Sequence, residues 1–250
     1  MQHIKELLTK MADDDLIIGH RNSEWTGLGP ILEEDISFSS MAQDKIGHAL
    51  GLYTILNTEL KETDPDKFAF HRKETEFKCC HLVELPIGEY DFSVIRHFLF
   101  DHAEKLRYES LQSSSFEPLA KFAKKIHGEI KYHIFHADSW ISRLGNANEE
   151  SKSRMQSALN YTLPYAFSIF EPGEFEEKLI AEKVFIGEKA LQVQWLEKIT
   201  PIIEAAGLKI TTVKNPTEHY GGRKGYHTEF LKPLIDEMTE VVRFDETANW

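Results

Sequence analysis

Four residues have the types, and the order along the chain, of ligands in a carboxylate-bridged di-iron centre. Such a centre takes one carboxylate from each of two helices and a Glu-x-x-His pair from each of two others. The matching residues are Glu24, His48, Asp101 and His133, each in a segment that is predicted to be helical. Carboxylate oxygens with one imidazole for each ion suit iron, and their negative charge offsets that of the cations.

The two remaining ligand positions hold residues that cannot bind iron. Each lies three residues before a histidine, where a glutamate would share a helix face with it. Lys45 precedes His48, and Ile130 precedes His133. The set therefore supplies two carboxylates in place of four, and Lys45 adds a positive charge that a low-dielectric interior screens little. We predict that this chain has no catalytic residue, no metal and no cofactor of its own.

A buried carboxylate without a partner is costly, so we expect another cation to replace the metal. Lys45 is the candidate, paired with Glu24 or Asp101. A pocket around Lys45 that binds an anion is a further possibility. The six positions are accordingly predicted to be the vestige of a di-iron site: Glu24, Lys45, His48, Asp101, Ile130 and His133.

A second alignment of acids and histidines remains open. Asp44 lies four residues before His48, and Glu129 lies four residues before His133. This spacing also keeps each pair on one helix face. The alternative function is therefore a metal-dependent oxidase or oxygenase that uses these four residues. The simpler interpretation is that Asp44 and Glu129 are ordinary acids at or near the surface.

Long amphipathic segments would position these residues. Apolar residues that recur at spacings of three and four predict helices. The four long ones cover about residues 2–26, 33–60, 91–111 and 117–145, with Asp91 as an N-cap and Gly145 as the residue that ends the fourth. Further helices are predicted at about 147–169, 174–187, 188–206 and 226–244, and only residues 209–214 alternate as a strand does.

The spacing of these helices indicates how they are connected. Short turns join the first two and the last two long helices, and an irregular link of about residues 61–90 separates the pairs. Two helical hairpins with one long crossover are typical of a ferritin-like four-helix bundle. We therefore predict an all-α single domain over residues 1–250, with a bundle core at about 2–145 and an appended helical region at about 146–250.

The composition excludes several classes of protein. The chain has 250 residues, 29 Lys and Arg against 41 Asp and Glu, and a formal net charge of −12. This balance argues against nucleic-acid binding, which needs a basic surface. No apolar run approaches the length of about 18 residues that a membrane span needs. Cys79 and Cys80 are adjacent and cannot form an ordinary disulfide staple, which favours a cytoplasmic location.

Two other features have simple interpretations. The glycines and basic residues of 221–231 could cradle a phosphate, but they lack the spacing of a phosphate-binding loop. A turn followed by Thr228 as a helix-capping residue is the preferred account. Neither Cys79 nor Cys80 has an evident base or cation beside it in the sequence, so neither is predicted to be reactive.

Six sequence motifs resemble one known family. They cover nearly the whole chain in order: GHRNSEWTG (19–27), PILEEDISFSSMAQDKIGHA (30–49), EFKCCHLVELPIGEYDFSVIRHFLFD (76–101), EIKYHIFHADSWISRLG (129–145), EESKSRMQSALN (149–160) and GGRKGYHTEFL (221–231). The sequence is similar to the C subunits of the bacterial multicomponent ring-1,2-phenylacetyl-CoA epoxidases. This resemblance implies a ferritin-like fold.

The resemblance also implies a function. In that family the C subunit is a non-catalytic, structural partner of the A subunit, which holds the di-iron centre and the substrate. The A subunit has glutamate at the positions that match Lys45 and Ile130. A small B subunit and an iron–sulfur flavin reductase are further expected partners in aerobic phenylacetate degradation. A homodimer is possible when the chain is isolated.

Overall fold

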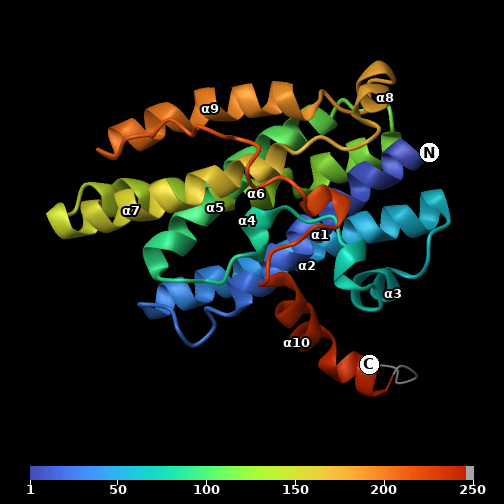
Figure 1. Ribbon diagram of the computed structural model, residues 1–250, viewed down its shortest axis with the longest axis horizontal. Helices are drawn as coiled ribbons and strands as arrows, with labels where there is room; N and C mark the ends of the chain where they lie inside the picture. Colours follow the sequence, from blue (N-terminus) through green and yellow to red (C-terminus); the bar gives the residue numbers. More distant parts are fainter. Residues whose placement is uncertain (246–250) are drawn as a thin grey trace. The chain divides into compact units, whose positions relative to one another are not determined.

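The computed structural model describes residues 1–245, and they form helices joined by turns and irregular segments (Figure 1). No β-strand occurs among these residues. The predicted all-α class is confirmed, but the predicted strand at 209–214 is wrong. There, Lys209 N donates to Gln156 Oε1 at 2.8 Å and Gln156 Nε2 donates to Lys209 O at 2.9 Å. A side-chain amide thus satisfies backbone groups that a strand would pair with a neighbour.

The chain divides into two compact units. The terminal unit contains Met1, residues 5–86 and the described chain from Gly221 onward, whereas the central unit contains residues 2–4 and 87–220. The expectation of a single domain, with a core at about 2–145 and an appended region at about 146–250, stays a prediction.

An antiparallel helical hairpin forms most of the terminal unit. It consists of α1 (Gln2–Ser23) and α2 (Leu32–Leu60). Three contacts show the antiparallel order: Lys5 pairs with Glu62 at 2.8 Å, Tyr53 Oη donates to Asp13 Oδ1 at 2.6 Å, and Gly19 lies against Ile46. The acids of the first turn of α2, Glu33, Glu34 and Asp35, complement the helix dipole.

The buried residues of α2 recur at spacings of three and four, as expected for a helix with one face in the core. They run from Glu34 to Leu56 and include Phe38, Met41, Leu52, Lys45 and His48. The periodicity that predicted the helix therefore also places two of the candidate ligand positions in the interior. A lysine on this face is unusual, because its charge has to leave water.

Short helices complete the terminal unit. They are α3 (Pro65–Phe70), the 3₁₀ turns η1 (Glu74–Glu76) and η3 (Gly222–Lys224), α4 (His81–Glu84) and α10 (Leu231–Phe244), which packs on α3 and η1. Glycine is required where η3 approaches the earlier segment. A Cβ on Gly222 would lie 2.1 Å from Cys79 O, and one on Gly225 would lie 2.2 Å from Thr75 O.

In the glycine-rich segment 221–231, the backbone at Gly222 and Gly225 therefore lies directly against the backbone of Cys79 and Thr75. Thr228 is not the N-cap of the helix that follows, because α10 begins after Phe230. The Thr228 hydroxyl accepts a hydrogen bond from Phe230 N at 3.3 Å and donates one to Glu84 Oε2 at 2.6 Å. The side chain that was predicted to cap the helix thus donates to Glu84, a residue that is distant in sequence.

Helix α5 (Tyr90–Leu111) is the buried centre of the central unit and contacts three others, α6 (Glu117–Gly145), α7 (Glu149–Ala166) and α9 (Glu188–Ala205). Figure 1 shows α5, α6 and α7 running alongside one another. The 3₁₀ turn η2 (Phe167–Phe170) and α8 (Glu176–Ala181) follow α7. Two predicted boundaries shift: the N-cap of α5 is Glu89 rather than Asp91, and Gly145 is still helical.

Long-range contacts set the helix directions in this unit. Tyr108 packs on Phe122 near one end of the α5–α6 pair, and Tyr90 packs edge-on against Trp140 near the other, so these helices are antiparallel. Trp195 Nε1 donates to Leu99 O at 2.9 Å, and Glu188 forms a buried ion pair with Arg107, so α9 is antiparallel to α5.

The order of the helices along the chain is that of a ferritin-like fold. One hairpin, α1–α2, and a second, α5–α6, are joined by one long connection, residues 61–89. This single long crossover between hairpins is the connectivity of ferritin-like bundles. Within the described residues, every helix is either too short or too polar to cross a lipid bilayer.

Candidate functional site

Glu24 of the terminal unit is engaged by an arginine. It follows the last residue of α1, as its C-cap, rather than lying within the helix as predicted. Its Oε1 accepts a hydrogen bond from Arg21 Nη1 at 2.7 Å, and a third of its side chain is exposed. Glu24 therefore pairs with Arg21, which lies one helical turn before it.

Lys45 and His48 lie one turn apart on the buried face of α2. Lys45 is fully buried and His48 is 2 % exposed. An ammonium at a ligand position opposes the binding of a multivalent cation beside it, because little solvent screens their repulsion. This half of the template therefore offers an imidazole and a positive charge, where the complete site would have an imidazole and a carboxylate.

The central unit holds the other half of the template. Asp101 on α5 and His133 on α6 are both fully buried, and His133 Nδ1 lies 4.0 Å from Asp101 Oδ1. Ile130 lies one turn before His133 with its aliphatic side chain in the core. His97 Nδ1 donates a hydrogen bond to the other oxygen of Asp101 at 2.6 Å. Asp101 thus lies between two imidazoles.

His97 was not predicted as a site residue. It lies four residues before Asp101 on α5, a spacing that places both side chains on one helix face. This spacing could have identified it in the sequence. The template has no position for it, however, so a search for the known ligand set did not find it.

Glu104 is a second missed residue. It is buried one turn after Asp101, and one donor atom from each of Asp101, Glu104 and His133 lies within 4.8 Å of the others. Two carboxylates and an imidazole are chemically able to hold a single divalent ion. The template allows one carboxylate from this helix, which is why Glu104 was overlooked.

The two acids of the shifted ligand set are less buried than the histidines they would join. Glu129 is exposed on α6, whereas His133 on the same helix is fully buried. Asp44 is half-buried on α2. The exposed position of Glu129 fits the simpler interpretation of an acid at the surface.

The six positions do not fit a di-iron pair. Each half provides one carboxylate and one histidine, and the position that should add a bridging carboxylate holds a buried ammonium or a buried aliphatic group. Glu24 is in addition held by Arg21. No chemical step through iron is therefore derived for this chain.

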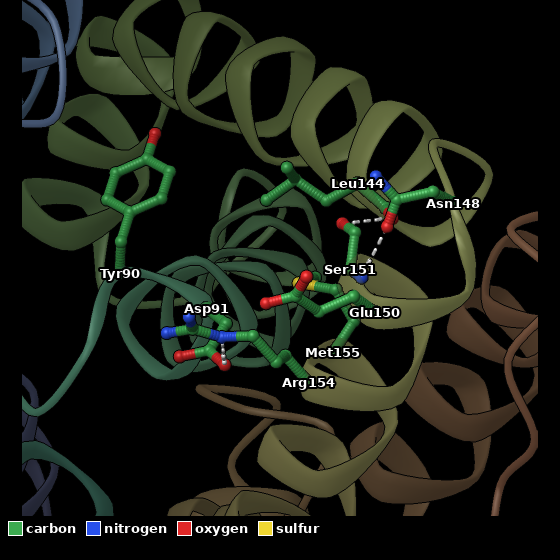
Figure 2. Close-up of a pocket in the computed structure, with 8 residues that line it drawn as sticks. All are labelled: Tyr90, Asp91, Leu144, Asn148, Glu150, Ser151, Arg154 and Met155. Atoms are coloured by element: carbon green, nitrogen blue, oxygen red, sulfur yellow. Dashed lines mark hydrogen bonds and ion pairs between the residues drawn. The ribbon is translucent and has the colours of Figure 1, made fainter.

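A surface pocket of about 320 Å³ in the central unit contains none of the predicted site residues. Figure 2 shows Arg154 beside Asp91 and Ser151 bonded to Asn148. The Arg154 Nε to Asp91 Oδ2 distance is 3.4 Å, so these two charges offset each other and Glu150 is the remaining charged residue of the lining. It is lined by Tyr90, Asp91, Leu144, Asn148, Glu150, Ser151, Arg154 and Met155. This pocket is open and lacks a catalytic constellation.

Together, the fold and the site define an all-α protein with ferritin-like connectivity and an incomplete set of di-iron ligands. Residues 1–250 match the family described as "Phenylacetic acid catabolic protein", and the chain belongs to this family. It is 28% identical over 253 residues to the C subunit of 1,2-phenylacetyl-CoA epoxidase from Escherichia coli (strain K12), and the alignment covers 100% of both chains. The resemblance carried by the six motifs is confirmed.

Proposed function

We propose that the chain is the non-catalytic structural subunit of a multicomponent phenylacetyl-CoA ring epoxidase that acts in aerobic phenylacetate degradation. Its partner would be a catalytic A-type subunit that holds the di-iron centre. The observation that carries this proposal is the pair of buried non-ligands, Lys45 and Ile130, at the positions where iron would need carboxylates. Full-length similarity to a C subunit supports the assignment.

The proposal explains why the helical framework persists without its metal ligands. Buried apolar side chains stabilise helices such as α5 and α6, and this stabilisation needs no cofactor. A rigid helical surface can then position a catalytic partner. The B subunit and the reductase are proposed as further components of the complex. We also propose a cytoplasmic location, which the two free, adjacent cysteines favour.

An apolar surface at the turn between α1 and α2 is a candidate for the contact with the A-type subunit. Leu28, Ile31, Leu32 and Ile36 are between about half and two thirds exposed, within nine residues of sequence. Clustered exposed apolar side chains mark interaction sites, because a monomer gains nothing from keeping them in water.

The test is co-purification of the chain with an affinity-tagged A-type subunit. We expect a stable complex, and we expect Leu32→Glu combined with Ile36→Glu to weaken it, since burying two carboxylates in an apolar interface is costly. Leu50→Glu is the matched control, because Leu50 is half exposed on α2 but lies outside the cluster. A chain that stays monomeric and does not bind the A-type subunit at micromolar concentration would refute the proposal.

A further inference from the structure

A second group of potential metal ligands lies within the terminal unit. Cys79 precedes α4, Glu84 ends α4, and His227 lies between η3 and α10. Cys79 Sγ is 3.7 Å from Glu84 Oε1 and 3.9 Å from His227 Nδ1, and Glu84 Oε1 is 2.7 Å from His227 Nδ1. The side chains of Glu84 and His227 are 0% and 4% exposed, and Cys79 is fully buried.

The hydrogen bonds of His227 show that this group requires a cation. His227 Nε2 lies 3.1 Å from the carbonyl oxygen of Phe77, which can only accept, so Nε2 carries the hydrogen. A neutral ring would then direct the Nδ1 lone pair at the Glu84 carboxylate. That contact at 2.7 Å is repulsive unless a positive species lies between the two atoms. The species is either a proton or a metal ion.

The surrounding contacts orient all three groups. The bond from His227 Nε2 to Phe77 O fixes the ring with Nδ1 toward the cluster, as commonly found for metal-bound histidines. Thr228 donates to Glu84 Oε2 through its backbone N at 2.7 Å and through its hydroxyl at 2.6 Å. Oε1 is thereby directed toward Cys79 and His227. Outer contacts of this kind hold ligands in place before a metal arrives.

We propose that Cys79 Sγ, Glu84 Oε1 and His227 Nδ1 bind one divalent cation of the zinc class. Sulfur, nitrogen and oxygen donors suit Zn²⁺, and a tetrahedral site separates its ligand atoms by about 3.4–3.6 Å. The two distances from the sulfur are already close to this range, and only Glu84 and His227 must move apart by several tenths of an ångström. A water molecule would complete the tetrahedron.

The bound ion would fasten the C-terminal segment to the segment before α5. Cys79 and His227 are 148 residues apart in the chain, so the ion would close a very long loop. Binding that requires the folded arrangement adds directly to the stability of the folded state. The proposed site is structural and is independent of the function proposed above.

Proton competition predicts how binding depends on pH. Burial raises the pKa of the Cys79 thiol well above its ordinary value, and the negative charge of Glu84 adds to the effect. Metal binding to a thiol releases its proton. The affinity for zinc should consequently rise with pH.

The test is a titration of the full chain, freed of metal by a chelator, with Co²⁺ and then Zn²⁺. We expect one equivalent of Co²⁺ to produce a thiolate-to-cobalt charge-transfer band. A hundredfold excess of Zn²⁺ over its Kd should raise the Tm by about 5 °C or more. Because the cluster of Asp101, Glu104 and His133 has no sulfur, an ion there cannot produce the band.

Two matched cysteine variants test whether Cys79 is the sulfur ligand of the ion. Cys79→Ala should abolish the band and the Zn²⁺-dependent shift of Tm, and Cys80→Ala should retain both, since Cys80 is equally buried but outside the cluster. The proposal is overturned if the wild-type chain shows no thiolate band, or if the band survives Cys79→Ala. The wild-type spectrum decides the matter even if a variant fails to fold.

Discussion

At the scale of single residues, two side chains decide whether iron can bind. Lys45 and Ile130 are buried where the di-iron template requires carboxylates, and neither side chain has a donor atom for iron. Residue type alone carries this conclusion, because no rotation or relaxation turns an ammonium into a ligand. Glu104 and His97 show that other polar residues have gathered around Asp101.

Metal analysis tests the residue-scale argument. Isolated protein, expressed with added iron, is expected to contain far less than the about two irons per chain of a complete centre. Elemental analysis measures the content. Two irons per chain that are lost in His48→Ala would contradict the structural role. A single ion that survives His48→Ala but is lost in Glu104→Gln would instead assign a mononuclear site to the central unit.

His20 makes a separate prediction about pH. Burial lowers the pKa of His20 below its ordinary value of 6.5, and the charge of Glu237 acts in the opposite direction. At pH values below about 6.5, His20 binds a proton more readily in the unfolded chain than in the folded chain. The free energy of unfolding therefore falls as the pH falls. His20→Gln should reduce this loss between about pH 6.5 and 5.

Urea denaturation at several pH values measures the effect. The exposed His71 of the same unit is the control, and His71→Gln should retain the pH dependence that His20 causes. An unchanged dependence in His20→Gln would contradict the assignment.

At the scale of secondary-structure elements, a buried carboxylate fastens the segment before α10 to α4. Glu84 accepts two hydrogen bonds from Thr228 and a third from His227. Arg21 joins the same elements by donating to the backbone carbonyls of Glu84 and Phe230. These polar contacts hold the N-terminal end of α10, and its buried side chains Leu231, Leu234 and Ile235 add apolar packing.

Glu84→Gln is therefore expected to destabilise the protein. The amide keeps the shape of the side chain but weakens charge-assisted hydrogen bonds, at a cost of about 2–4 kcal/mol in the free energy of unfolding. Urea denaturation in the presence of a chelator measures it without a metal contribution. Glu229→Gln, an exposed change in the same segment, should cost less than about 0.5 kcal/mol. Equal costs would contradict the fastening role of Glu84.

At the scale of the whole molecule, exposed apolar residues predict the behaviour of the isolated chain. Besides the cluster between α1 and α2, Phe135 and Tyr132 are exposed on α6 of the central unit. Such side chains favour association. We expect the isolated chain to form homodimers or larger species at micromolar concentration. An added A-type subunit should convert them to a mixed complex.

Analytical ultracentrifugation with and without the A-type subunit measures this exchange. Leu32→Glu with Ile36→Glu should shift the isolated chain toward the monomer, provided that the same surface serves both contacts. A wild-type chain that remains monomeric throughout, with the partner absent or present, would contradict the prediction.

Much of the fold was predictable because helices depend on local sequence. Apolar residues at spacings of three and four place α2 and α6 within a residue or two of their observed bounds. The prediction of a strand at 209–214 was wrong because the backbone of Lys209 bonds to the side chain of Gln156 and not to a neighbouring strand. The capping role of Thr228 was wrong because α10 begins only after Phe230, and the Thr228 hydroxyl donates to Glu84, 144 residues away in sequence.

The sequence by itself determined the membership of the family, the helical class and the absence of two iron ligands. Each of these depends on residue types, on local spacing or on motifs along the chain. Only the tertiary structure decided that Asp101 and Glu104 meet His133 of another helix, and that His227 lies beside Cys79. The physical reason is that burial and long-range contacts control which charges meet, and no local pattern records them.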